Sequence, residues 1–333
     1  MSFVLRFVDL FAGIGGIRLG FEQVFPDGET VFVSEQDMKA QETYRANFST
    51  PEVFEGDITK VELGDVPDFD VCLAGFPCQA FSIAGKRQGF NDSYKGQSRG
   101  TLFAEVIRIC EARKPKVIFC ENVKGLVTHD RGNTLRVIVG AFEEIGYKVH
   151  YEVLNSCDFG VPQNRERVFI VCFRQDVDDS GFMFPNGVET GCVIRDVLDG
   201  APVDAKYYLS DVYLETLREH RRKQEEKGNG FGYVVRDLDG VAGAVVCGGM
   251  GRERNLIIDS RPHSLVPTTR IKGVVNREDI RKLTPREWAR LQGFPDGFVL
   301  PVSDTQLYKQ LGNSVTVPVV AAVAGSIRDV LEG

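Results

Sequence analysis

The chain has 333 residues, enough for one large domain or two moderate ones. Apolar residues make up 43% and charged residues 26% of it, which is typical of a soluble globular protein. No apolar run approaches the roughly 20 residues of a membrane span, and residues 1–6 lack the features of a signal peptide. The eight cysteines form no C-x-x-C pair, which argues against a metal site and a disulfide framework and favours a reduced, cytoplasmic setting.

The charge is unevenly distributed along the chain. A net charge of −7 would by itself argue against binding to nucleic acid. Residues 217–282, however, contain 14 Lys or Arg against 9 Asp or Glu, so a basic face is compatible with the acidic total.

The first predicted unit is a strand at residues 6–10, a glycine-rich turn at 11–16 and a helix from 17 onwards. This order presents backbone N–H groups and a helix N-terminus to a ligand. The dinucleotide fingerprint G-x-G-x-x-G would need glycine at position 18, where Arg18 stands. The turn therefore suits a nucleoside better than a dinucleotide pyrophosphate.

Two acids follow the next two predicted strands. Glu35 comes after residues 30–33, about twenty residues past the glycine turn, where a carboxylate commonly accepts hydrogen bonds from ribose hydroxyls. Its alternative role is that of a solvated acid at a helix N-terminus. Asp57 follows a short strand at 53–54. We expect Gly13, Glu35 and Asp57 to converge on one nucleoside-shaped pocket.

A candidate nucleophile follows the fourth predicted strand, residues 69–74. Gly75 and Pro77 break this strand, so Cys78 stands just past its carboxyl end, where open α/β sheets bind their ligands. A lone cysteine more often only packs in the core. A glycine-rich, charged loop follows up to residue 100, which suits a nucleophile under a closing loop. Glu121 follows the strand at 117–120 and should face the same edge.

The α/β pattern ends near residue 176. Before it, Arg165 and Arg167 open a strongly apolar strand at 167–173, and the alternative for each is a solvated surface charge. Beyond it we expect a smaller, irregular β-rich domain with a charged helix at 214–227 and a glycine-rich loop that carries Arg252 and Arg254. Thr284 and Pro285 then begin a helix. The fold class is α/β, with one domain at 1–185 plus 284–333 and another at 186–283.

Taken together, the motifs resemble those of the DNA (cytosine-5)-methyltransferases of bacterial restriction–modification systems, over nearly the whole chain. They occur in the family's order at residues 9–16 (DLFAGIGG), 75–79 (GFPCQ), 121–123 (ENV), 163–167 (QNRER), 290–295 (RLQGFP) and 310–315 (QLGNSV). Six motifs in register make the match highly specific.

The resemblance implies a Rossmann-like catalytic domain that uses S-adenosylmethionine and a target-recognition domain that reads duplex DNA. The cofactor-binding residues that it implies are Phe11, Gly13, Gly15, Glu35, Asp57, Ile58, Pro77, Leu102 and Asn313. Asn313 comes from near the chain's end, which implies that residues after about 284 fold back onto the first domain.

The chemistry of the reaction suits the same residues. Carbon 5 of cytosine is a poor nucleophile, and a thiolate that adds to carbon 6 activates it, which is the implied role of Cys78. Glu121 would bind ring nitrogen 3 and the exocyclic amine, while Arg167, assisted by Arg165, would bind the carbonyl oxygen at carbon 2. Because a stacked base does not expose carbon 6 to the thiol, the cytosine should flip out of the duplex under the loop that ends at residue 100.

The second domain is expected to bind the DNA. Arg252 and Arg254 are candidates for bidentate guanine contacts, with phosphate contacts equally compatible, and Ser82 is a further DNA-binding candidate. The resemblance also implies a monomer and a cognate restriction endonuclease as genetic partner.

Three other functions compete with this one. A tRNA cytosine-5 methyltransferase on the same scaffold typically carries a Cys-Phe-Thr signature, which this chain lacks. A catalytically silent DNA-binding regulator would not need Cys78, Glu121 and Arg167 together. A nicotinamide-dependent oxidoreductase is disfavoured by Arg18. The DNA methyltransferase is the reading that fits the motifs best.

Overall fold

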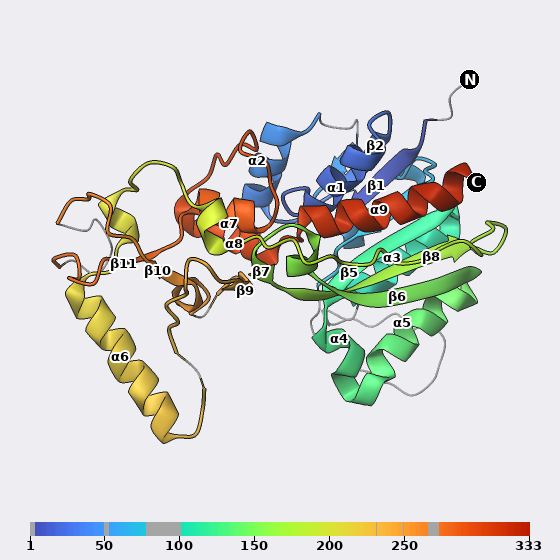
Figure 1. Ribbon diagram of the computed structural model, residues 1–333. Helices are drawn as coiled ribbons and strands as arrows, with labels where there is room; N and C mark the ends of the chain where they lie inside the picture. Colours follow the sequence, from blue (N-terminus) through green and yellow to red (C-terminus); the bar gives the residue numbers. More distant parts are fainter. Residues whose placement is uncertain (1–3, 50–52, 78–100, 231, 249, 266–272) are drawn as a thin grey trace. The chain divides into compact units, whose positions relative to one another are not determined.

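The computed structural model describes residues 4–49, 53–77, 101–230, 232–248, 250–265 and 273–333 (Figure 1). The chain forms two compact units. The first comprises Met1–Leu154, Glu166–Asn186 and Val319–Gly333, and the second Asn155–Arg165 and Gly187–Pro318. The division predicted from the sequence assigns catalysis to residues 1–185 plus 284–333 and target recognition to residues 186–283. This assignment stays a prediction.

The first unit is built on a mixed sheet of seven strands within the described residues, in the order β3-β2-β1-β4-β5-β8-β6. The strands are β1 (Arg6–Leu10), β2 (Glu29–Ser34), β3 (Val53–Glu55), β4 (Val71–Ala74), β5 (Val117–Val123), β6 (Tyr147–Asn155) and β8 (Glu166–Arg174). The five strands from β3 to β5 run parallel, and β8 pairs antiparallel to β5. The predicted α/β class with a Rossmann-like sheet is confirmed.

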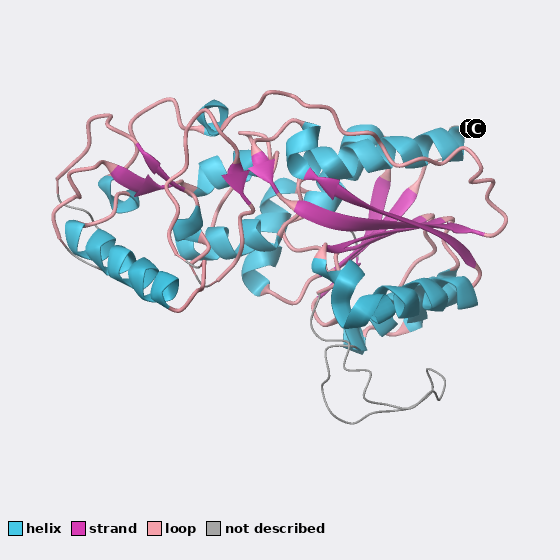
Figure 2. Ribbon diagram, turned by 60° about the horizontal axis from the view of Figure 1, so that its bottom comes forward, coloured by secondary structure: helices cyan, strands magenta, loops and turns pink. Residues whose placement is uncertain are grey.

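Helices cover both faces of this sheet (Figure 2). In chain order they are α1 (Gly16–Val24), α2 (Met38–Asn47), α3 (Thr101–Arg113), α4 (Gly125–Thr128), α5 (Asn133–Glu144) and α9 (Val317–Glu332). Alternate strand residues face opposite sides. Val8 and Cys72 therefore join the core that α3 and α5 complete. On the other side, the ring of Phe21 in α1 packs edge-on against Phe7 and Phe119.

The strand order makes the carboxyl end of β1 a candidate ligand site. Its two neighbours are β2 on one side and β4 on the other, so the chain's path reverses direction there. In open α/β sheets, ligands bind outside the carboxyl ends of the strands at such a point. The glycine-rich turn between β1 and α1 lies at this place.

The second unit has short strands and three longer helices in its described part. Strand β7 (Gln163–Asn164) pairs with β9 (Ala242–Gly243), and β10 (Leu256–Ile258) pairs with β11 (Ile280–Lys282). The helices are α6 (Asp211–Glu226), α7 (Pro285–Leu291) and α8 (Asp304–Asn313). Leu209, Leu214, Leu217, Leu256 and Ile280 form a small apolar core. The expected irregular, β-containing second part is present.

The charged helix begins earlier than the sequence suggested. We expected it at residues 214–227, and α6 begins at Asp211. The hydroxyl of Ser210 accepts a hydrogen bond from the backbone nitrogen of Tyr213 at 3.2 Å, so Ser210 is the N-cap. The cap, and not the first apolar residue, sets the start of the helix.

One apolar stretch of the described chain, Asp304–Glu332, has the length and composition of a membrane span, with a mean hydropathy of 1.5 in its most apolar window. It comprises two helices, because α8 ends at Asn313 and α9 begins at Val317. The apolar residues Val320, Val323 and Ile327 of α9 are buried. A Cβ added to Gly20 in α1 would overlap the side chain of Val320, so the two helices pack closely. The apolar character of α9 is that of a core helix.

Candidate active site

The turn between β1 and α1 has three residues in the left-handed region, Phe11 and Gly13 at φ 57° and Gly15 at φ 84°. The two glycines serve different purposes. A Cβ on Gly15 would overlap the ring of Phe48, so this glycine is needed for packing. A Cβ on Gly13 would meet nothing within 4 Å. The turn therefore leaves open space beside Gly13.

Glu35 connects this turn to the end of β2. One carboxylate oxygen, Oε2, accepts a hydrogen bond from the backbone nitrogen of Gly13 at 2.7 Å, and Oε1 accepts one from that of Asp37 at 2.6 Å. The structure thus brings together Gly13 and Glu35, as the sequence predicted for the strand ends.

Asp57 follows β3, the strand next to β2. Its Oδ1 accepts hydrogen bonds from the backbone nitrogen and the hydroxyl of Thr59 at 3.1 and 2.7 Å. The hydroxyl bond is the main cause that lowers the pKa of this carboxyl from its usual 3.8. Asp57 thus caps a short 3₁₀ helix and stays an anion at neutral pH, while Ile58 is buried in the core.

Three more candidate residues belong to the first unit. Phe11 and Leu102 are partly buried against the apolar core that includes Phe103. Pro77 is exposed, three residues after the end of β4. Ligand pockets are lined mostly by apolar side chains, so these three apolar residues are suitable for lining one.

Glu121 and Arg167 form an ion pair between two neighbouring strands. The distance from Nε of Arg167 to Oε1 of Glu121 is 3.1 Å, and the two side chains are only 16% and 11% exposed. Strand β5 continues to Val123, so Glu121 lies inside the strand and not after it as we expected. Shielding from water strengthens the attraction between the two charges. The pair holds both groups in a defined orientation.

Asn122 joins this pair to the turn after β4. Its side-chain Nδ2 donates a hydrogen bond to the backbone oxygen of Phe76 at 2.9 Å. The described residues stop at Pro77 and resume at Thr101, so Cys78, Ser82 and the loop up to residue 100 lie outside them.

Arg165 and Asn313 belong to the second unit, whereas Arg167 belongs to the first. Arg165 is buried, and its guanidinium donates to the backbone oxygens of Val245, Gly312 and Ser314. Asn313 ends α8 and accepts a hydrogen bond from the thiol of Cys247 at 2.6 Å. Their predicted roles, on the cytosine and on the cofactor, stay predictions.

The two arginines of the glycine-rich loop lie in a short 3₁₀ helix, Arg252–Arg254. Glu253 between them is buried and accepts a hydrogen bond from the hydroxyl of Tyr213 at 3.1 Å. The guanidinium of Arg252 lies over the ring of Tyr308, 5.4 Å from its centroid, and Arg254 is exposed. Among the described residues, neither arginine forms an ion pair, so both have charge available for a ligand.

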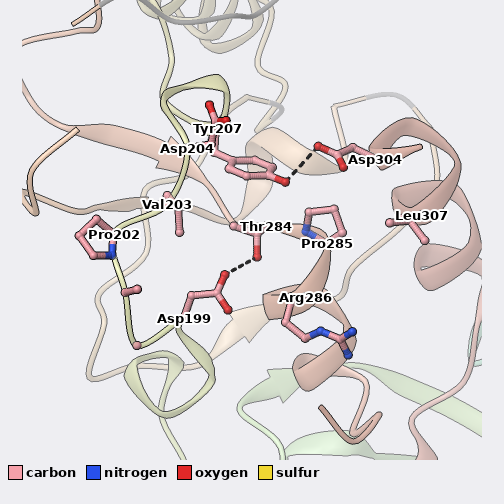
Figure 3. Close-up of a pocket in the computed structure, with 12 residues that line it drawn as sticks. Asp199, Pro202, Val203, Asp204, Tyr207, Thr284, Pro285, Arg286, Asp304 and Leu307 are labelled. Atoms are coloured by element: carbon pink, nitrogen blue, oxygen red, sulfur yellow. Dashed lines mark hydrogen bonds between the residues drawn. The ribbon is translucent and has the colours of Figure 1, made fainter. Parts of the chain in front are cut away.

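The second unit has a pocket lined by residues of 199–207, 284–286 and 304–307 (Figure 3). Its polar groups already have partners: the hydroxyl of Thr284 donates to Asp199 at 3.0 Å, and that of Tyr207 donates to Asp304 at 3.0 Å. None of the predicted site residues lines it. The pocket therefore adds nothing to the site.

Sequence reasoning missed a buried polar group behind the glycine turn. Asp9 on β1 accepts a hydrogen bond from the hydroxyl of Tyr44 at 3.2 Å, and Nη1 of Arg18 donates to the same hydroxyl at 3.1 Å. Burial raises the pKa of Asp9 to about 7, and the positive charge of Arg18 opposes this. An acid within an apolar strand, with an arginine nine residues later, is the only sequence signal of this group.

Comparison with known proteins identifies the family. The family model of the C-5 cytosine-specific DNA methylases matches residues 5–329. The chain belongs to this family. It is 51% identical over 329 residues to the type II methyltransferase M.HpaII of Haemophilus parainfluenzae, covering 98% of this chain and 89% of that protein. It is 40% identical over 331 residues to M.HhaI of Haemophilus parahaemolyticus, covering 97% and 94%.

Solved structures share the fold. The Dnmt2 methyltransferase of S. pombe superposes with a TM-score of 0.75 at 20% identity, over 99% of this chain and all of that one. This C-5 cytosine methylase is thus an enzyme that methylates carbon 5 of cytosine in DNA, of the restriction–modification type, and the prediction from its motifs is confirmed. The silent regulator, the oxidoreductase and the tRNA enzyme are set aside.

Proposed function

We propose that the enzyme transfers the methyl group of S-adenosylmethionine to a cytosine that is flipped out of a short, specific duplex DNA sequence, through a covalent adduct with Cys78. The observation that carries this proposal is the largely buried ion pair of Glu121 and Arg167, next to the strand end that leads to Cys78. A carboxylate and a guanidinium in one orientation match the polar edge of a single cytosine ring.

The residues around the glycine turn suit the methyl donor. S-adenosylmethionine supplies an electrophilic methyl group on a sulfonium ion. The open space beside Gly13 would accommodate the ligand, and the carboxylate of Glu35 at the end of β2 would accept hydrogen bonds from its ribose hydroxyls. Asp57, an anion at the next strand end, would accept the adenine amine. Gly15, Ile58, Phe11, Leu102, Pro77 and Asn313 would complete the pocket.

The proposed chemistry divides the work among three residues. The thiolate of Cys78 forms a bond to carbon 6, which shifts electron density onto carbon 5. Glu121 accepts hydrogen bonds from the exocyclic amine and from ring nitrogen 3, which gains a proton as the thiolate adds, and Arg167 donates to the oxygen at carbon 2, so both stabilise the charge that develops on the ring. After methyl transfer, carbon 5 loses its proton and the thiolate leaves carbon 6, which regenerates the free thiol.

The remaining parts of the proposal concern DNA and the cell. Arg252 and Arg254 would contact guanine edges or phosphates, and Ser82 would contact the DNA close to Cys78. Flipping the base would make room for the attack on carbon 6. We propose that the enzyme works as a monomer in the cytoplasm, with a cognate restriction endonuclease as its genetic partner.

The test is bisulfite sequencing of mixed-sequence duplex DNA after incubation with the purified enzyme and S-adenosylmethionine. We expect protected cytosines within one short recurring sequence, and no protection without the cofactor or with Cys78→Ala. A Cys72→Ala variant is the matched control, because Cys72 is buried in the core of the same unit and has no part in the chemistry. Protection that persists in Cys78→Ala would contradict the covalent route.

A further inference from the structure

The guanidinium of Arg165 is held by backbone oxygens on two sides. Nη1 donates to the oxygen of Val245 at 2.6 Å. Nη2 donates to the oxygens of Gly312 at 3.3 Å and Ser314 at 2.5 Å. These oxygens are 80 to 149 positions away along the chain, and Arg165 is only 2% exposed. A buried guanidinium whose two terminal nitrogens bind backbone in this way connects chain segments.

The two connected segments both lead to functional candidates. Val245 precedes the glycine-rich stretch that continues to Arg252 and Arg254, the DNA-binding candidates. Gly312 and Ser314 flank Asn313, the cofactor-binding candidate from the end of the chain. One buried side chain therefore sets the spacing between a segment expected at the DNA and a residue expected at the cofactor.

Neighbouring side chains strengthen the same connection. The buried amide of Gln163 accepts a hydrogen bond from the nitrogen of Val245 at 2.9 Å and donates to the oxygen of Leu291 at 2.7 Å. The buried amide of Gln292 donates to the oxygens of Leu311 and Ser314 at 2.8 and 3.1 Å. Both segments are thus bound by three buried side chains, those of Arg165, Gln163 and Gln292. We call these three residues the clamp.

The two segments are also in direct contact. A Cβ added to Gly312 would overlap the backbone nitrogen of Cys247, so glycine is required for this approach. The thiol of Cys247 donates to the side chain of Asn313 at 2.6 Å. The position of the candidate cofactor residue therefore depends on the segment that leads to the DNA-binding arginines.

We propose that Arg165 is a positioning residue that couples DNA binding to cofactor binding through the clamp, and that it does not bind the cytosine itself. This inference rests on the proposed function. Arg165 sets the place of Asn313 relative to the glycine-rich loop, so the loss of its guanidinium weakens the binding of both substrates. The chemical step, which depends on Glu121 and Arg167 of the first unit, keeps its rate once both substrates are bound.

The test separates binding from chemistry. We compare Arg165→Gln with Arg167→Gln, measuring KM for DNA and for S-adenosylmethionine, cofactor affinity by calorimetry, and the single-turnover rate at saturation. For Arg165→Gln we expect both KM values and the cofactor Kd to rise about tenfold or more, because charge-assisted hydrogen bonds are lost, with the saturated rate within about threefold of the unaltered enzyme. For Arg167→Gln we expect the rate to fall and the cofactor Kd to stay.

Two further variants distinguish the loss of the clamp from a general loss of folding. Gly312→Ala would push the two segments apart without removing any polar group, and it should reproduce the Arg165→Gln pattern. Arg286→Gln is the matched control, since Arg286 also donates to two backbone oxygens of this unit, those of Pro295 and Phe298, outside the clamp. Its KM values should not change.

Different outcomes would contradict the inference and the proposed function. If Arg165→Gln lowers the saturated single-turnover rate and leaves cofactor affinity unchanged, Arg165 acts on the cytosine and the inference is wrong. If Gly312→Ala leaves both KM values and the cofactor Kd unchanged, the two segments are not coupled and the inference is again wrong. If the unaltered enzyme fails to protect any cytosine from bisulfite, the proposed function fails first, and calorimetry with the cofactor alone still decides whether the clamp positions Asn313.

Discussion

At the scale of single residues, Asp9 shows how burial changes an acid. Its side chain is almost fully buried in β1, and Oδ1 has no hydrogen-bond partner among the described residues. The ionised form is therefore poorly solvated, which raises the pKa from 3.8 to about 7. Arg18 and the hydroxyl of Tyr44 lower it, and the negative charges of Glu35 and Glu22 raise it.

The shift at Asp9 predicts how stability depends on pH. A carboxyl whose pKa is higher in the folded state contributes stability that is fully present below about 3.8 and is lost as the pH rises to about 7. At about 1.4 kcal/mol per pKa unit, a rise from 3.8 to about 7 makes this loss on the order of 4 kcal/mol. Asp9→Asn has no charge to desolvate, so its free energy of unfolding should fall less than that of the unaltered enzyme between pH 5 and 7. Urea unfolding at several pH values measures this, and parallel curves for the two proteins would refute it.

The Glu121–Arg167 pair predicts a loss of rate. Glu121→Gln keeps the shape of the side chain and removes its charge, so Arg167 loses its ionic partner and the ring its carboxylate. We expect the single-turnover rate to fall by about 100-fold or more, with cofactor affinity unchanged. The matched control is Glu166→Gln, because Glu166 on β8 forms an exposed ion pair with Lys124, the residue that follows β5. A comparable rate loss in both variants would show that the effect is structural.

The sequence could predict those site residues whose positions follow from the order of neighbouring strands and helices along the chain. Gly13 and Glu35 follow the ends of β1 and β2, and parallel strands in one sheet end at one edge, so their proximity was predictable. The surroundings of Arg165 were not. Its side-chain partners are brought to it by the fold of the second unit from 80 to 149 positions away, and no local pattern indicates such contacts.

At the scale of elements, α7 shows a helix start that the sequence defines fully. The hydroxyl of Thr284 accepts from the nitrogen of Glu287 at 3.1 Å, and Glu287 accepts from the nitrogen of Thr284 at 2.7 Å. This reciprocal pair, with Pro285 at the first turn, is a capping box. It was predictable because all of its partners lie within four residues.

The cap predicts a measurable contribution to stability. Thr284→Ala removes the capping oxygen and also the bond to Asp199, so the free energy of unfolding should fall by about 1–2 kcal/mol. Thr284→Ser keeps the hydroxyl and is the matched control, with an expected change below about 0.5 kcal/mol. Denaturant titration measures both variants. Equal losses would mean that the methyl group, and not the hydroxyl, stabilises this helix start.

At the scale of the whole molecule, the charges divide into those already paired and those available to DNA. The local basic excess suggested by the sequence includes α6, but the arginines of this helix have carboxylate partners. Arg221 pairs with Glu225 and Arg222 with Glu226, each at 2.9 Å. Counting charges along the chain could not separate these from Arg252 and Arg254, because the pairing depends on the helix and the fold. We therefore expect DNA to bind at the loop and not at α6.

This division predicts different salt dependences for two similar arginines. The guanidinium of Arg252 lies 5.4 Å from the ring centroid of Tyr308, and that of Arg221 lies 5.7 Å from that of Tyr233, but only Arg221 has an ion-pair partner among the described residues. If Arg252 contacts a phosphate, Arg252→Ala lowers the slope of log K against log salt by about 0.9 on every duplex. If it reads a guanine, the variant loses about 1–3 kcal/mol on the target alone. Arg221→Ala should change neither quantity, and a slope change in this control as large as that in Arg252→Ala would place DNA on α6.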